Sequence, residues 1–329
     1  MKAVVYTQYG PPEVLRLADL DRPAPRENEV LIQVHATTVT AEDCIFRKGR
    51  PLAARSATGL LRPKYPTLGT DLAGVVVAAG AKVTRFREGD EVWGATGAEF
   101  GSYAEYICLP EDGAIAPKPN TLNFAEAAAV CGGILTAFPF LRDTAKLERG
   151  QQILIIGASG SVGTAAVQLA KHLGAEVTGV CSTGNLELVR SLGADAVIDY
   201  TREDFTQDGR TYDVIFDAVG KNSFSRCKGS LKPRGIYLST VISAGILFHT
   251  LWTSKRGSKR GVIAFTGLRP PSEKAADLLL VKELCEAGSY TPVIDRHYPL
   301  EHIVEAHRYV DQGHKKGSVV LTVAPGEAG

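Results

Sequence analysis

The sequence predicts an α/β protein with two domains, a β-rich domain followed by a doubly wound parallel sheet of six strands. The chain has 329 residues, which at roughly 150 residues per domain gives about two domains. Its first third alternates strand-like runs with glycine and proline turns. From residue 152 onward, strand-like runs alternate with helix-like segments, the pattern of a nucleotide-binding sheet with crossover helices.

The β-rich domain is expected to hold short strands separated by turns, and a helical, alanine-rich stretch follows it at 122–141. The strands are expected at 1–6, 29–39, 73–79, 90–94 and 102–109. Residues 290–329 contain a strand, a helix and a strand, which we expect to return to the first domain. The predicted domains are therefore 1–121 with 290–329, and 122–289.

Six apolar runs predict the parallel sheet, at 153–156, 177–181, 196–199, 214–217, 236–239 and 262–266. Helices are expected at 162–173, 186–192 and 275–287. In the first of these, apolar residues at 162, 166, 169, 170 and 173 recur with the period of a helix.

Composition excludes several classes of protein. The 37 Lys+Arg and 36 Asp+Glu leave a formal net charge of +1, so there is no basic surplus for a nucleic-acid partner. The six cysteines form no C-x-x-C pair, which favours a reducing, cytoplasmic compartment. The chain opens on a strand-like run without a leader pattern, and the apolar stretch 241–252 is too short for a bilayer, so we expect no membrane partner.

The first strand of the sheet runs into a glycine-rich loop with the spacing G-x-x-G-x-x-G. A loop between a strand and a helix is the context in which such glycines hold a pyrophosphate against backbone N–H groups. A structural turn without a ligand is the alternative. The predicted contacts are Gly157, Ser159, Gly160, Ser161, Val162 and Gly163.

The end of the second strand indicates which dinucleotide binds. NAD sites place an Asp or Glu there to bind the ribose 2′-hydroxyl, whereas this turn has neither acid nor base. Hydroxyls and an amide suit a 2′-phosphate, so NADPH is favoured over NADH. The predicted contacts are Cys181, Ser182, Thr183 and Asn185. Tyr200, after the third strand, either lends its hydroxyl to the cofactor or stacks on the adenine; a partly buried strand-end tyrosine is the alternative.

Several ordered motifs resemble the zinc-independent medium-chain dehydrogenases/reductases, in the quinone oxidoreductase and enoyl reductase branch. They are Gly-Thr-Asp-Leu-Ala-Gly-Val-Val at 69–76, Gly-Asp-Glu-Val at 89–92, Leu-Gly-Ala-Asp at 192–195, Ile-Asp-Tyr at 198–200 and Gly-His-Lys-Lys-Gly at 313–317. The resemblance covers essentially the whole chain. It implies a GroES-like catalytic domain, a Rossmann domain, an active site in the cleft between them, and a homodimer.

The resemblance also assigns further cofactor contacts. It places Thr136 at the nicotinamide. It also implies that Lys316 contacts a phosphate of the cofactor; the alternative is that Lys316 is a solvated surface lysine. The residues implied to line the cofactor after the later strands are Val219, Ser239, Val241, Phe265 and Thr266. For the apolar ones, a role as strand-end core is the alternative.

By the same resemblance, a catalytic zinc would need Cys, His and Cys where this chain has Thr40, Thr70 and Gly132. A structural zinc would need four cysteines near 95–115, and only Cys108 lies there. We therefore expect no metal, because zinc needs soft ligands in a tetrahedral set.

Without a Lewis acid, the easier reaction is hydride donation to an acceptor that is already electron-poor. The resemblance thus implies NADPH-dependent reduction of a small quinone or an α,β-unsaturated carbonyl compound. Some relatives place a catalytic tyrosine where this chain has Ile45. The remaining polar candidates for catalysis are Asp43, Arg47 and Tyr65, with water or a ribose hydroxyl as alternatives.

Two other functions stay open. A basic run at 254–260 favours a CoA-thioester enoyl reductase, although a solvated loop is the simpler explanation. The missing tyrosine allows an NADPH-binding sensor or structural protein with little turnover. The neighbouring apolar stretch 241–252 would cap a substrate pocket or pack against a second subunit.

Overall fold

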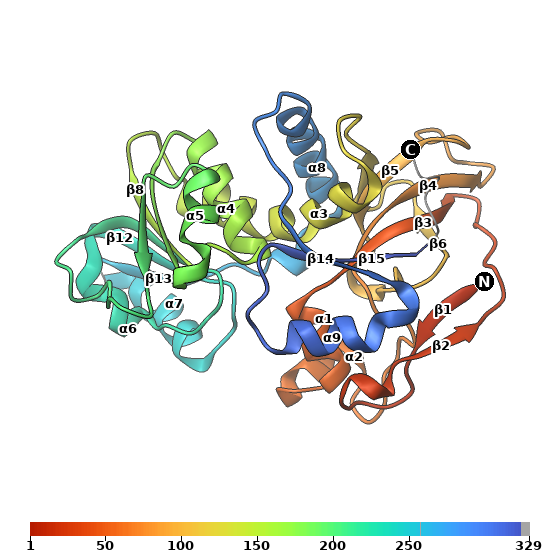
Figure 1. The fold of residues 1–329 in the computed structure, drawn as a ribbon, viewed down its shortest axis with the longest axis horizontal. Coiled ribbons are helices and arrows are strands. Elements are labelled where there is room, and N and C mark those ends of the chain that lie inside the picture. The colour runs from red at the N-terminus through yellow and green to blue at the C-terminus, as the bar shows by residue number, and fades with distance from the viewer. Residues whose placement is uncertain (257, 324–329) are drawn as a thin grey trace. The chain divides into compact units, whose positions relative to one another are not determined.

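The computed structural model describes residues 1–256 and 258–323. The chain forms two compact units, Met1–Gly132 with Arg269–Gly329, and Gly133–Leu268. The predicted boundaries at 121/122 and 289/290 differ from these. Helix α8 (Pro271–Glu286), blue in Figure 1, belongs to the first unit because it contacts strand β7 (Ile115–Pro117) and because Glu286 accepts a hydrogen bond from the Asn120 N–H at 3.0 Å.

The first unit is built on a seven-stranded sheet in the order β14-β15-β3-β4-β5-β7, with β6 also pairing with β3. Among the described strands of this sheet, β14 and β15 pair in parallel and the other pairs are antiparallel. A separate antiparallel pair joins β1 (Lys2–Val5) and β2 (Arg16–Asp19). The other strands are β3 (Glu29–Val39), β4 (Asp71–Ala79), β5 (Glu91–Ala95), β6 (Tyr106–Pro110), β14 (Ile294–Pro299) and β15 (Ser318–Thr322).

Helices and single helical turns complete this unit. They are η1 (Pro12–Val14), α1 (Ala41–Lys48), η2 (Leu52–Ala54), α2 (Arg55–Thr58), η3 (Gly97–Glu99), the start of α3 (Phe124–Phe138), α8, η8 (Leu300–His302) and α9 (Ile303–Asp311). Of these, α8 contacts β7, while α9 contacts β3, β14 and β15. Helix α1 shows why the local sequence folds this way. Thr40 and Asp43 form a reciprocal capping box at its start, and Gly49 ends it with φ of +59°, a conformation that favours glycine.

The second unit is a parallel sheet in the order β10-β9-β8-β11-β12-β13. Its strands are β8 (Gln152–Ile156), β9 (Glu176–Cys181), β10 (Ala196–Asp199), β11 (Tyr212–Asp217), β12 (Leu231–Ser239) and β13 (Arg260–Ile263). All six predicted runs are strands, and the predicted α/β fold with a doubly wound sheet is confirmed. The run 262–266 was placed too late, because β13 ends at Ile263.

The remaining elements of this unit are the end of α3, the π-helical turn η4 (Pro139–Ala145), α4 (Ser161–His172), η5 (Thr183–Asn185), α5 (Leu186–Ser191), α6 (Phe224–Cys227), η6 (Lys228–Ser230), α7 (Ala244–Arg256) and η7 (Thr266–Leu268). Helix α4 contacts β8 and β9, and helix α5 contacts β9 and β10; Figure 1 draws both helices in green. The strand order runs outward in both directions from β8 and β11, which are neighbours at the centre of the sheet. Because all six strands are parallel, their carboxyl ends lie at the same edge, and ligands bind at that edge in such sheets.

The longest apolar helical segment is Phe124–Ala145, which α3 and η4 form together, and not the stretch 241–252. By length and composition it could cross a membrane, yet 72% of its 18-residue window is buried inside the protein. A core helix of a soluble protein passes the same test, so this segment is weak evidence for a membrane span. The absence of a membrane partner stays a prediction.

Candidate functional site

The glycine loop of the second unit lies between β8 and α4, as predicted. Gly157 has φ of +77°, and a Cβ there would stand 2.7 Å from Val219 Cγ1. A Cβ on Gly163 would lie 2.0 Å from the Gly157 carbonyl oxygen. Both positions therefore require glycine for the turn itself, whether or not a ligand binds.

Gly160 differs from these two glycines. A Cβ on Gly160 would meet only the Gly157 oxygen, at 3.6 Å, and its backbone is extended with φ of −79°. It is the N-cap of the twelve-residue helix α4, and no side chain caps that helix. The open space over Gly160 and the first-turn N–H groups fit the pyrophosphate of a dinucleotide, because no described residue comes close enough to require a glycine at this position.

A hydrogen-bonded bridge joins this loop to the turn after β9. Buried Asn185 donates from Nδ2 to Ser159 Oγ at 3.0 Å and to Ser182 Oγ at 3.2 Å. Three residues predicted as cofactor contacts thus lie together. Cys181 is buried at the end of β9, where burial raises the pKa of its thiol to about 11, so it contributes a neutral side chain.

Four predicted contacts are exposed apolar or aromatic side chains at the carboxyl edge of the sheet. They are Tyr200 at 55%, Val219 at 43%, Val241 at 44% and Phe265 at 49% exposure. Strand-end core residues would be buried, so the exposure favours ligand contact.

Other predicted contacts have different surroundings. Ser239 is buried, and its hydroxyl accepts from the Val241 N–H at 3.2 Å, which shapes the turn after β12. Thr266 begins η7, and Thr136 is half-buried on α3. Helix α3 presses on the start of α4, since a Cβ on Gly133 would lie 2.6 Å from the Ser161 carbonyl oxygen. Lys316 belongs to the other unit, where its N–H donates to Asp295, so its cofactor contact stays a prediction.

Sequence reasoning missed Asp217, which organises the loop after β11. This fully buried carboxylate accepts hydrogen bonds from the N–H groups of Val219, Gly220 and Asn222 at 2.8–3.1 Å. The Tyr237 hydroxyl also donates to it at 2.9 Å. Asp217 thereby holds Val219 at the sheet edge. Its place at the end of an apolar strand was the available signal.

The polar candidates in the first unit fare differently. Asp43 is fully buried, and its carboxylate accepts from the Thr40 hydroxyl at 2.6 Å and from the Gly69 N–H at 3.3 Å. Burial raises the pKa of Asp43 in spite of these donors. The carboxylate caps α1 and fastens the Gly69 turn, which leaves it without access to a substrate.

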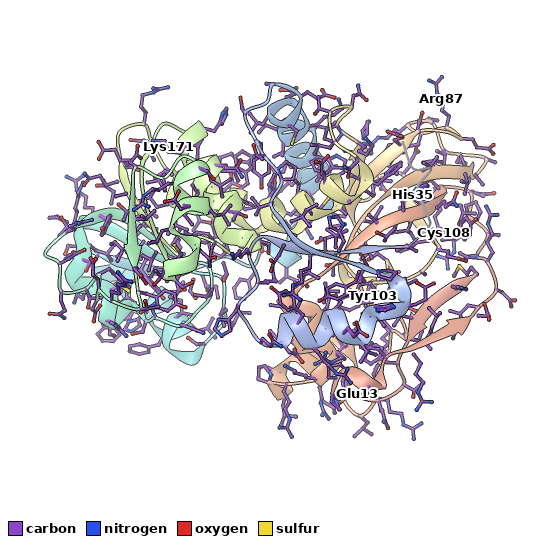
Figure 2. The ribbon with its side chains drawn as sticks, viewed as in Figure 1. Glu13, His35, Arg87, Tyr103, Cys108 and Lys171 are labelled. Carbon is purple, nitrogen blue, oxygen red and sulfur yellow. The ribbon has the colours of Figure 1, made fainter. Side chains whose placement is uncertain are left out.

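Arg47 is fully buried as well. Its guanidinium donates to Asp311 at 2.6 Å, to His307 Nδ1 at 3.1 Å and to the Gly10 carbonyl at 3.3 Å. Burial and the adjacent cation lower the pKa of His307 to about 3, so His307 is neutral. The edge of its ring packs on Tyr103, labelled in Figure 2, with centroids 5.8 Å apart. These contacts tie α1 to α9, so the structure gives Arg47 a packing role and not the predicted catalytic one.

Tyr65 keeps an available hydroxyl. The residue is half-buried, and its ring packs edge-on against Phe100 at 5.7 Å. Its oxygen accepts a hydrogen bond from Lys64 Nζ at 3.1 Å. The phenol proton is therefore still free to be donated, since no described residue accepts it.

The positions implied for a catalytic zinc hold no ligand side chain, and a second buried carboxylate lies among them. Asp71 follows Thr70, and its Oδ2 accepts from the Thr38 hydroxyl at 2.6 Å. Burial raises the pKa of Asp71 to about 7. Cys44 and Cys131 are buried, and desolvation raises the pKa of both thiols. Within residues 1–256 and 258–323, no group of three or more His, Cys, Asp or Glu could hold a metal ion.

Two family models match the chain. One, described as an alcohol dehydrogenase GroES-like domain, matches residues 26–120, and one described as a zinc-binding dehydrogenase matches residues 192–321. The chain is 36% identical to a 2-methylene-furan-3-one reductase of Solanum lycopersicum, over 99% of this chain and 80% of that protein. It is 35% identical, with the same coverage, to the chloroplastic NADPH-dependent alkenal/one oxidoreductase of Arabidopsis thaliana.

The fold is also that of a solved quinone oxidoreductase from Coxiella burnetii. The two share a TM-score of 0.88 and 30% identity, over 98% of this chain and 99% of that one. The chain belongs to the medium-chain dehydrogenase/reductase family, in the branch of the quinone and alkenal oxidoreductases. The predicted resemblance is confirmed.

Proposed function

We propose that this chain is an NADPH-dependent reductase that transfers hydride, without a metal ion, to a quinone or to the C=C bond of an α,β-unsaturated carbonyl compound. The observation that carries the proposal is a contrast between two sites. The glycine loop leaves open space over Gly160 for a pyrophosphate. The three positions at which a catalytic zinc would need Cys, His and Cys hold Thr40, Thr70 and Gly132 instead. The names of the relatives in alkenal and quinone reduction support the same reaction class.

NADPH, when bound, supplies the hydride. The second unit positions it: the loop at Gly160 receives the pyrophosphate, and the Ser159–Asn185–Ser182 bridge sets the distance to the ribose end. An enone or quinone accepts hydride at carbon and shifts charge to its oxygen, so the protein must then offer that oxygen a hydrogen bond.

We assign this hydrogen bond to Tyr65. Among Asp43, Arg47 and Tyr65, it alone combines partial exposure with a hydroxyl proton that no described residue accepts. The Lys64 ammonium, 3.1 Å from the phenol oxygen, also favours negative charge at that point. Solvent or a ribose hydroxyl is the alternative donor.

The two alternative functions receive less support. The basic run that favours a CoA thioester includes residue 257, which lies outside the described residues. Of the described part, Lys259 is engaged, because its Nζ donates to the Lys228 carbonyl at 2.8 Å. An NADPH-binding sensor would share the cradle and differ only in turnover.

We further propose a homodimer in the cytoplasm. Exposed Phe248 and Trp252 stack on one another on α7, with centroids 5.7 Å apart, and give that helix an apolar surface for a second subunit. All six cysteines are free, which suits a reducing compartment. Sedimentation at several protein concentrations measures the oligomeric state.

The direct test is NADPH oxidation by chelator-treated protein, with a simple quinone and a simple enone offered in parallel. Turnover of either supports the proposal, and the ratio of kcat/KM values identifies the better acceptor. Tight NADPH binding with no turnover of either acceptor would favour the sensor. Turnover confined to a CoA thioester would favour the enoyl reductase.

A further inference from the structure

The turns after β9 and β10 lie side by side. Asp199, the last residue of β10, pairs in register with Cys181, the last residue of β9. The Tyr200 N–H continues the ladder by donating to the Cys181 carbonyl at 3.1 Å. Residues 200–202 therefore border the turn that was predicted to distinguish NADPH from NADH.

Asp199 places a carboxylate at this corner, and both of its oxygens already accept hydrogen bonds. Oδ2 accepts from the Thr183 hydroxyl at 2.5 Å, and Oδ1 accepts from the N–H and hydroxyl of Thr201 at 3.0 and 2.7 Å. The Thr183 and Thr201 donors lower the pKa of Asp199, so it stays ionised at neutral pH.

This arrangement corrects the expected role of Thr183. A phosphate monoester is mainly a hydrogen-bond acceptor, and the Thr183 proton is already donated to Asp199. The Ser182 hydroxyl accepts from Asn185 and keeps its proton. An ionised carboxylate at the corner would also repel a 2′-phosphate unless a cation were nearby.

Arg202 places a cation at this corner. Its Nε lies 3.6 Å from Asp199 Oδ2, its N–H donates to the Asp199 carbonyl at 3.0 Å, and its side chain is 73% exposed. Asp199 thus holds the guanidinium near the β9 turn, while most of its surface stays open to a ligand. The turn itself, residues 182–185, contains no Lys or Arg.

We infer that Arg202 is the cation that binds the 2′-phosphate of the cofactor, with Ser182 as a neighbouring hydroxyl donor. The inference rests on the proposed use of NADPH. Arginine presents several donors in a plane and binds phosphate in a bidentate manner. The Asp199–Arg202 pair therefore supplies the charge that the β9 turn lacks.

The experiment measures binding to the full-length protein by calorimetry, with 2′,5′-ADP and 5′-AMP as probes and then NADPH and NADH. Arg202→Ala should weaken 2′,5′-ADP and NADPH by about tenfold or more, the loss of one charge-assisted contact, and leave 5′-AMP and NADH unchanged. Arg210→Ala is the matched control, since Arg210 is an exposed arginine of the same unit paired with Asp208 at 3.7 Å.

The outcomes separate the inference from the proposed function. An unchanged ratio of NADPH affinity to NADH affinity in Arg202→Ala overturns the inference. Arg190, the α5 arginine paired with Glu187, is the competing cation. If Arg190→Ala selectively loses NADPH affinity and Arg202→Ala does not, the inference is overturned as well. A wild-type protein that binds neither dinucleotide, or that prefers NADH, overturns the cofactor assignment itself.

Discussion

Gly132 and Asp71 are in such close contact that a Cβ on Gly132 would lie 2.7 Å from Asp71 Oδ2. Thr38 holds that oxygen from the other side at 2.6 Å. Since Gly132 is also the third of the implied zinc positions, a cysteine there would collide with a carboxylate that is already fixed. A cysteine at residue 132 would therefore require the Asp71 carboxylate to move.

This contact predicts strong coupling between the two positions. Gly132→Ala should destabilise the wild type, because relief of the clash requires a buried carboxylate to move. In an Asp71→Ala background the same change should be neutral or stabilising, since alanine favours the helix by up to about 1 kcal/mol. Denaturant unfolding of the four proteins measures the coupling, for which we expect about 1–3 kcal/mol. Additive effects would contradict the contact.

Asp71 should also make stability depend on pH. Its pKa is raised to about 7 by burial, so the folded state binds a proton more tightly than the unfolded chain. The protonated form stabilises the fold fully below about pH 4, and this contribution is lost as pH rises to 7, by up to about 1.4 kcal/mol per unit. Charges facing it include Glu42, Asp43 and Lys315. The free energy of unfolding of Asp71→Asn, relative to that of the wild type, should therefore increase from pH 4 to pH 7 and stay constant above pH 7. Parallel curves of unfolding free energy against pH for the two proteins would refute this.

The open space over Gly160 predicts a variant that folds and fails to bind. The Cβ of a residue at position 160 would meet only the Gly157 oxygen, at the ordinary contact distance of 3.6 Å, and the extended backbone there suits valine in Gly160→Val. NADPH binding should be abolished while the melting temperature changes by only a few degrees. Gly229→Val, at another glycine with nothing within 4 Å of an added Cβ, should keep both properties. If Gly160→Val retained its affinity for NADPH, the pyrophosphate would not bind at this loop.

Arg47 is expected to matter for stability and not for chemistry. Arg47→Met strips a buried guanidinium from Asp311 and His307 and should cost about 3 kcal/mol or more. Arg87, labelled in Figure 2 and 90% exposed, provides the control: Arg87→Met should stay within about 0.5 kcal/mol. The fraction of Arg47→Met that remains folded should have the same KM and kcat as the wild type. A stable but inactive variant would restore the catalytic role.

Tyr65 is expected to act in turnover alone. Tyr65→Phe removes the hydroxyl proposed to bind the substrate oxygen, which should lower kcat by about 10²-fold. The Kd for NADPH should not change. Tyr106→Phe, in a tyrosine whose ring instead lies under Arg22, is the control. Equal kcat values for wild type and Tyr65→Phe would mean that solvent or the ribose provides the proton.

Local patterns predicted the fold well, and the site only where the site is itself local. The strands of the parallel sheet and the glycine loop each follow from a short stretch of sequence, and they lie where they were expected, except that β13 begins and ends earlier than the predicted run 262–266. Neither predicted domain boundary coincides with the limits of the compact units. Periodicity predicts that α8 is a helix, but it cannot say which sheet that helix covers.

The roles of the buried charged residues were the part of the site that the sequence predicted least well. Arg47 was predicted as catalytic, whereas its partners are Asp311 and His307, some 260 positions away in the chain. No spacing rule connects such residues, because tertiary packing alone brings them together. The same holds for Asp199, whose effect depends on donors from Thr183 and Thr201. A carboxylate at the end of an apolar strand is the signal that Asp199 shares with Asp217.

The most direct test follows the hydrogen itself. Chelator-treated protein, shown by elemental analysis to be free of zinc, is given a small enone and NADPH that carries deuterium at both C4 positions of the dihydronicotinamide. We predict a saturated ketone that carries one deuterium at its β-carbon, formed at the same rate with and without chelator. Product without the label, or activity that returns only when zinc is added, would contradict metal-free hydride transfer.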